Sequence, residues 1–136
     1  MSNVRMPGLR LLAAAVVLAA GICSAAAQGS PCARANEADP VKLLGELTEQ
    51  DKLPEVFRDP AYVALQDKAT WAMWTFTREG QPAHPAVVCR RPVQEGDVIT
   101  LEMVVTCKGG ETACVQLTQE FRALNAIMAL EMNKPK

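Results

Sequence analysis

The sequence predicts an α+β domain: two short N-terminal helices, a three-stranded antiparallel meander, and a long C-terminal helix packed on one face of the sheet, with two disulfides. Three observations lead to this prediction. Two Asp-Pro pairs, at 39–40 and 59–60, are typical helix starts. Apolar and alternating segments between residues 71 and 107 are separated by glycine and proline, which indicates strands joined by loops. An apolar stripe with helical spacing then runs from Cys114 to Met128.

The N-terminus has the three parts of a secretory signal peptide, which we assign to residues 1–27. Residues 1–10 contain arginine and no acidic residue, Leu11 to Ile22 form an apolar run, and small residues lead to Ala27. This run of 12 residues is too short to cross a hydrocarbon core of about 30 Å. We therefore expect export to the periplasm or the extracellular space, with no membrane span left after cleavage.

Two alternatives to cleavage after Ala27 stay open. Leu9 through Ala27 make 19 residues, which is long enough for an uncleaved N-terminal anchor. Cys23 follows the apolar run and could carry a lipid, although Ile22 stands where lipoprotein processing favours a small residue.

Cleavage after residue 27 would leave 109 of the 136 residues, which suits one domain. We divide this part into an N-terminal arm over residues 28–38 and a single α+β domain over residues 39–136. It would hold 12 basic and 15 acidic residues, a formal net charge of −3. This balance excludes a strongly basic nucleic-acid-binding protein, and the apolar content excludes a disordered tail.

Four cysteines remain after residue 27, an even number that predicts two structural disulfides in a small exported protein. We expect Cys107–Cys114 and Cys32–Cys89, because the strand register places Cys89 and Cys107 on opposite faces of the sheet, too far apart to be joined. The chain has no Cys-x-x-Cys sequence, so neither a thioredoxin-like redox site nor a zinc-ligand pair is expected.

The helices are placed by their start signals and apolar spacing. The first is predicted over residues 39–50. Residues 51–58 are predicted to form a turn followed by a brief helical piece. The second short helix is predicted over residues 59–68, and the long C-terminal helix over residues 111–133.

The three predicted strands cover residues 71–77, 86–93 and 98–107. Odd-numbered positions of the third strand are apolar, which is typical of a half-buried strand. These segments would form the meander through two hairpins.

The register of the meander follows from the expected turns. A four-residue turn would pair Val93 with Val98, and a tight turn centred at Gly80 would pair Trp74 with Ala86. Both pairings are conditional, because a slip by one residue exchanges the two faces of a strand.

His84 is the only histidine and lies between two prolines. One interpretation is a rigid loop, and the alternative is a general base near neutral pH. The alternative needs a pocket in which an acidic side chain lies within about 3.2 Å of the ring. The sequence offers no second histidine for a metal and no Gly-x-Ser-x-Gly motif, so no metal site and no catalytic residues are predicted.

Two further groups are candidate binding residues. Arg90 and Arg91 form a basic pair that, with Arg78, could hold an anionic group or be neutralised by nearby carboxylates. A partner patch could be formed by Trp71, Met73 and Trp74, or these residues could belong to the core.

These features predict a small exported domain without catalytic activity that binds another envelope protein. The candidate binding residues are Trp71, Met73, His84, Arg90 and Arg91, and no cofactor or nucleic acid is predicted. The alternative is a small periplasmic hydrolase or ligand-processing enzyme that uses His84 with a nearby carboxylate. A third possibility is a structural accessory protein without a ligand of its own.

Overall fold

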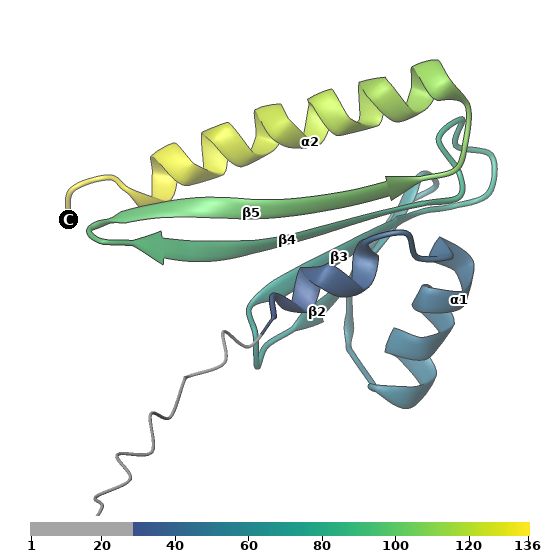
Figure 1. The fold of residues 1–136 in the computed structure, drawn as a ribbon, viewed down its shortest axis with the longest axis horizontal. Helices are drawn as coiled ribbons and strands as arrows, with labels where there is room; N and C mark the ends of the chain where they lie inside the picture. The colour runs from purple at the N-terminus through teal and green to yellow at the C-terminus, as the bar shows by residue number, and fades with distance from the viewer. Residues whose placement is uncertain (1–28) are drawn as a thin grey trace, which may run out of the picture.

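The structure is a computed structural model that describes residues 29–136, so the predicted signal peptide, residues 1–27, lies outside the described residues. A five-stranded antiparallel sheet in the order β1-β2-β3-β4-β5 forms the centre, and the long helix α2 runs along β5 (Figure 1). In chain order the elements are the 3₁₀ helix η1 (Pro31–Ala35), α1 (Pro40–Gly45), the π-helical turn η2 (Glu46–Gln50), β1 (Glu55–Arg58), β2 (Tyr62–Asp67), β3 (Ala72–Thr77), β4 (Ala86–Glu95), β5 (Val98–Cys107) and α2 (Glu111–Met132).

The α+β class, the long C-terminal helix and the two disulfides are confirmed, whereas the three-stranded sheet is wrong. The first predicted helix is present as α1 and η2, which end at Gln50. The second predicted helix, over residues 59–68, is wrong because this segment forms β2. The helical piece predicted in residues 51–58 is also wrong, since this segment contains β1.

The same side-chain contact begins α1 and closes the β1–β2 hairpin. Oδ1 of Asp39 accepts the backbone N–H groups two and three residues later at 3.0 and 3.1 Å, and Oδ1 of Asp59 does so at 2.8 and 2.6 Å. After Asp59, Val63 and Leu65 are buried with the period of a strand, so the chain continues into β2. Asp-Pro therefore marks a turned backbone without deciding between a helix and a hairpin.

A two-residue turn joins β4 and β5. Glu95 pairs with Val98 across this turn, so the predicted pair of Val93 with Val98 is wrong by two residues. Gly96, at φ +63°, supplies the left-handed backbone that so short a turn needs. Because the shift is even, every side chain of β4 and β5 stays on its predicted face.

The β3–β4 register differs more strongly from the prediction. Trp74 pairs with Cys89 rather than Ala86, a shift of three residues. The connection is not a tight turn, because residues 78–85 form a longer loop with internal backbone hydrogen bonds of 3.2 and 2.8 Å. An odd shift exchanges the faces of β3 relative to β4, so Trp74 lies on the face of Cys89 and Met73 on the other.

Each face of the sheet carries its own hydrophobic core. The N-terminal segment covers one face, and α2 covers part of the other through Leu117 and Phe121, its two buried residues. The prediction that the long helix packs on one sheet face is therefore confirmed. The first core buries Cys32, Ala35, Leu43, Leu47, Val63, Leu65, Ala72, Trp74, Phe76, Val87 and Cys89, and the second buries Ala83, Ala86, Val88, Leu117 and Phe121.

The two disulfides join the covering segments to the sheet, and their pairing is the predicted one. Cys32–Cys89 links η1 to β4 with Cα atoms 5.3 Å apart, so the predicted arm is held on the sheet by a covalent bond. Cys107–Cys114 links the end of β5 to the first turns of α2, with Cα atoms 5.7 Å apart.

The helix α2 is fixed to β5 at both ends. Besides the disulfide at its N-terminal end, Asn133 at its C-terminal end binds the backbone of Ile99: Oδ1 accepts the N–H at 2.8 Å and Nδ2 donates to the carbonyl at 2.7 Å. Although α2 has 22 residues, neither it nor any other helix within residues 29–136 is suited to span a membrane. Because α2 runs along β5, it does not cover β1–β3 on the sheet face where it packs.

We expect the disulfide that closes the longer loop to contribute more stability. The linked cysteines are separated by 57 residues in Cys32–Cys89 and by 7 in Cys107–Cys114. In the chain-entropy description, these loops correspond to about 4 and about 2.5 kcal/mol. Denaturant titrations of the paired serine variants Cys32→Ser/Cys89→Ser and Cys107→Ser/Cys114→Ser should therefore show the larger loss for the first pair. Equal losses would contradict the prediction.

Gly109 is predicted to be the glycine least tolerant of a side chain. A Cβ at this position would collide with the backbone of Ala83, whereas the nearest atom to a Cβ at Gly110 is 3.8 Å away. Gly109→Ala should lower the free energy of unfolding by about 1–3 kcal/mol, the usual cost of overpacking. Gly45→Ala is the control and should not lower the free energy of unfolding, because a Cβ there meets nothing within 4 Å and the backbone is helical.

Candidate functional site

An apolar groove lies beside α2, over the part of the sheet that the helix leaves uncovered. We term it the α2 groove. Its volume is about 590 Å³, within the range of about 300–1,000 Å³ that is usual for small-molecule sites. It is lined by Val56, Phe57, Asp59, Tyr62, Ala64, Gln66, Met73, Thr75, Arg90, Glu120, Phe121 and Leu124.

The floor of the groove is set by the strand register. Gln66 pairs with Met73, and Met73 pairs with Arg90, so these three side chains form one row across β2, β3 and β4. Ala64 and Thr75 pair in a second row on the same face. The floor therefore combines apolar Ala64 and Met73 with the polar side chains of Gln66, Thr75 and Arg90.

Aromatic rings close one end of the groove. The Tyr62 and Phe121 rings meet edge to face with centroids 6.0 Å apart, and Gln81 Nε2 holds the Tyr62 hydroxyl at 3.1 Å. Apolar side chains remain accessible at the walls, where Phe57 of β1 is 51% exposed and Leu124 of α2 is 41% exposed. These exposed apolar walls suit contact with an apolar ligand.

Arg90 is the one cation that lines the α2 groove. Its guanidinium lies 5.0 Å from the centre of the Phe121 ring, and Nη1 donates to Asn125 Oδ1 at 3.3 Å and to Met128 Sδ at 3.5 Å. Its Nε is buried and has no hydrogen-bond partner among residues 29–136. Burial lowers the pKa of Arg90, although an arginine side chain stays protonated in proteins.

The two carboxylates that line the groove are held by other contacts. Asp59 accepts the backbone N–H groups of the β1–β2 turn, and Glu120 Oε1 accepts a hydrogen bond from Gln116 at 3.1 Å. Neither forms an ion pair with Arg90 in the described part of the chain. Arg90 therefore meets an aromatic ring, an amide and a thioether where most partly buried cations meet an anion.

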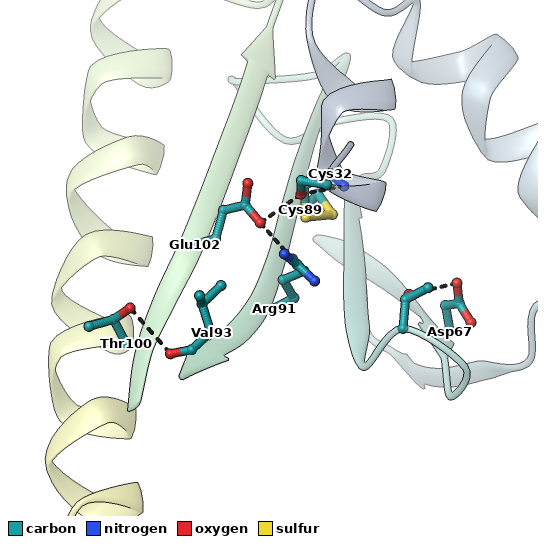
Figure 2. Close-up of polar contacts among 9 residues, drawn as sticks. Cys32, Asp67, Cys89, Arg91, Val93, Thr100 and Glu102 are labelled. Carbon is teal, nitrogen blue, oxygen red and sulfur yellow. Dashed lines mark hydrogen bonds and ion pairs between the residues drawn. A yellow bond between two sulfur atoms is a disulfide. The ribbon is translucent and has the colours of Figure 1, made fainter. Parts of the chain in front are cut away.

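The predicted basic pair is divided between the two faces of the sheet. Arg91 points away from the α2 groove, and its Nε donates to Glu102 Oε2 at 2.7 Å. Figure 2 shows this ion pair beside the Cys32–Cys89 disulfide. Arg78 is elsewhere, with Nη1 bound to the Asp59 carbonyl at 2.6 Å. The three arginines are therefore not brought together.

His84 lies in another hollow, which has a volume of about 710 Å³ and also contains Glu79. His84 Nδ1 is 3.0 Å from the Thr77 carbonyl, and because a carbonyl only accepts, Nδ1 carries the ring proton. A second contact, at 3.3 Å, joins Nδ1 to Thr77 Oγ1. In residues 29–136 no ion pair involves His84. The two contacts of the ring with Thr77 attach the 78–85 loop to β3.

The predicted Trp71 and Met73 patch is also divided. Trp71 lies outside β3, in the β2–β3 turn, where it is 68% exposed and has a left-handed φ of +59°. Met73 lies in β3 and lines the α2 groove. Of the five candidate binding residues, Met73 and Arg90 share one site, while the other three lie apart.

The groove residues contributed by β1 and β2 were not predicted from the sequence. They are Val56, Phe57, Tyr62, Ala64 and Gln66, all in segments predicted as helical. The alternation of Tyr62 and Ala64 with buried Val63 and Leu65 was the available signal.

Comparison with protein-family models, with curated protein sequences and with solved structures found no match to this chain.

Glu102 is predicted to make the domain sensitive to acid. Partial burial favours a higher pKa for Glu102, but hydrogen bonds from Ser30 and Arg91 together with the Arg91 charge outweigh it, so the pKa is lowered. A lowered folded-state pKa gives stability above the unfolded value of about 4.3, and this stability is lost as pH falls through the folded pKa. Glu102→Gln should therefore be less stable than wild type at pH 7, with the gap closing below about pH 4.

The measurement is urea denaturation at stepped pH, with Glu95→Gln as a control at an exposed position of the same hairpin. A gap between Glu102→Gln and wild type that stays constant from pH 7 to pH 3 would contradict the prediction.

Proposed function

We propose that this protein is a small exported binding domain without catalytic activity, and that the α2 groove is its binding site. The observation that carries the proposal is the combination of an open apolar groove with Arg90 in its floor, a cation that has no ion-pair partner among residues 29–136. Apolar pockets with a few convergent polar groups are the usual form of a ligand site.

The two disulfides support the exported part of the proposal. Disulfides persist in oxidising compartments such as the periplasm and the extracellular space, and they are rare in the cytosol. In this structure they hold both covering segments on the sheet. This agrees with the signal peptide predicted at the N-terminus.

The residues of the groove support binding as the role of the site. Met73, Phe57, Phe121 and Leu124 offer apolar contact, and Arg90 offers a fixed positive charge. Such a site recognises a ligand by its shape, its apolar surface and one anionic group. The partner is then a molecule, or a segment of another envelope protein, that carries these features.

The test is binding of N-phenyl-1-naphthylamine, an uncharged dye whose fluorescence rises in apolar surroundings, to the disulfide-bonded protein. Leu124→Glu places a charge in the wall of the groove and should weaken dye binding at least tenfold, since burying an unpaired carboxylate against apolar surface is costly. Leu130→Glu is the matched control, because Leu130 lies on the same helix, is 70% exposed and does not line the groove. It should change dye affinity less than twofold.

Equal weakening by both variants would show that the dye binds another part of α2. Absence of dye binding to the wild-type protein would remove the support for an apolar ligand site.

A further inference from the structure

One edge of the Arg90 guanidinium has no partner. Its hydrogen bonds to Asn125 and Met128 both use Nη1, and its Nε is without a partner among the described residues. Arg58 in the same chain shows what the matching edge of an arginine normally does, because its Nε and Nη2 bind the two carboxylate oxygens of Glu55 at 2.7 Å each. Arg90 has no such carboxylate among residues 29–136, and it differs from the exposed Arg58 in that its Nε is buried.

Building on the proposed function, we infer that the ligand of the α2 groove is a long-chain alkyl carboxylate, whose chain lies on the groove floor and whose carboxylate pairs with Arg90. A carboxylate is the usual partner of a guanidinium. Because Nε of Arg90 is buried and Nη1 already binds Asn125 and Met128, the contact is assigned to Nη2. The pair would form beside Phe121 and away from bulk water, where a charge-assisted hydrogen bond is strong.

The other charges of the groove favour a single negative charge on the ligand. Asp59 and Glu120 also line the groove, so a dianion would face two carboxylates with only Arg90 to compensate. A carboxylate carries one charge, which Arg90 balances. A cationic amphiphile would be attracted by Asp59 and Glu120 but repelled by Arg90 at the floor. It therefore serves as the comparison ligand of opposite charge in the test.

The lining of the groove favours an alkyl chain over a peptide. Every peptide unit brings an N–H and a carbonyl that must be paired when they are buried. For this the floor offers only the side chains of Gln66, Thr75 and Arg90, and Thr75 is buried. An alkyl chain brings no such groups, and the unbranched Met73 can adapt to its path.

The experiment displaces N-phenyl-1-naphthylamine from the wild-type protein with three ligands that share a similar chain, at pH 8 and below micelle-forming concentrations. Dodecanoate carries the carboxylate, methyl dodecanoate removes its charge, and dodecyltrimethylammonium reverses it. We expect dodecanoate to bind at least tenfold more tightly than the other two. This comparison needs no variant.

Two variants then assign the preference to Arg90. Arg90→Gln should reduce the advantage of dodecanoate over methyl dodecanoate to less than threefold. Arg91→Gln is the matched control on the same strand, because Arg91 lies on the opposite face and pairs with Glu102. It should keep the full advantage.

The outcomes separate the ligand class from the binding function itself. If the dye binds but dodecanoate is no tighter than its ester, or if the cation binds tightest, the alkyl carboxylate is wrong while the binding domain stands. If Arg90→Gln keeps the preference, the pairing with Arg90 is wrong. If neither the dye nor any of the three ligands binds, the proposed function fails as well.

Discussion

The alternation of side chains along β4 is the constraint on which the rest of the structure depends. Odd-numbered residues of this strand face the N-terminal segment, and Cys89 fixes that segment with a covalent bond. Even-numbered residues face α2, and Val88 lies beneath that helix. The same alternation sends Arg91 to a carboxylate on one face and Arg90 to the α2 groove on the other. The two covering layers and the candidate site thus follow from the alternation of side chains along β4.

The groove exists because one helix is too narrow for this sheet. Strands lie about 4.8 Å apart, so five strands span roughly 19 Å, whereas a helix with its side chains is about 10 Å wide. The helix could rest over the middle and leave two narrow margins, but it is fixed to β5 by Cys107–Cys114 at one end and by Asn133 at the other. The part of the sheet that α2 does not cover therefore lies entirely over β1–β3. There it forms one groove of about 590 Å³ instead of two narrow margins.

Sequence reasoning succeeded where a conclusion depended only on which face of the sheet a side chain takes, or on an apolar pattern that extends over a whole element. The pairing of Cys107 with Cys114 required only that β4 and β5 keep their relative faces, which an error of two residues leaves unchanged. It failed where a local signal has two structural outcomes, as with Asp59, whose contacts fit both a helix cap and a hairpin turn. Met73 and Arg90 were identified as binding residues, but their common site depends on the β3–β4 register. That register is set by the conformation of the 78–85 loop, which the sequence does not reveal although it predicts where the loop begins and ends.

Asn133 has a consequence beyond holding α2 in place. A side-chain amide carries an acceptor oxygen and an NH2 donor group, and here it meets both backbone groups of Ile99 as the residue of a neighbouring strand would. β5 is one of the two outer strands of the sheet, and an open outer strand is a template for another chain. Asn133 therefore occupies, at one residue, the backbone groups that an added strand would need at this end of the edge.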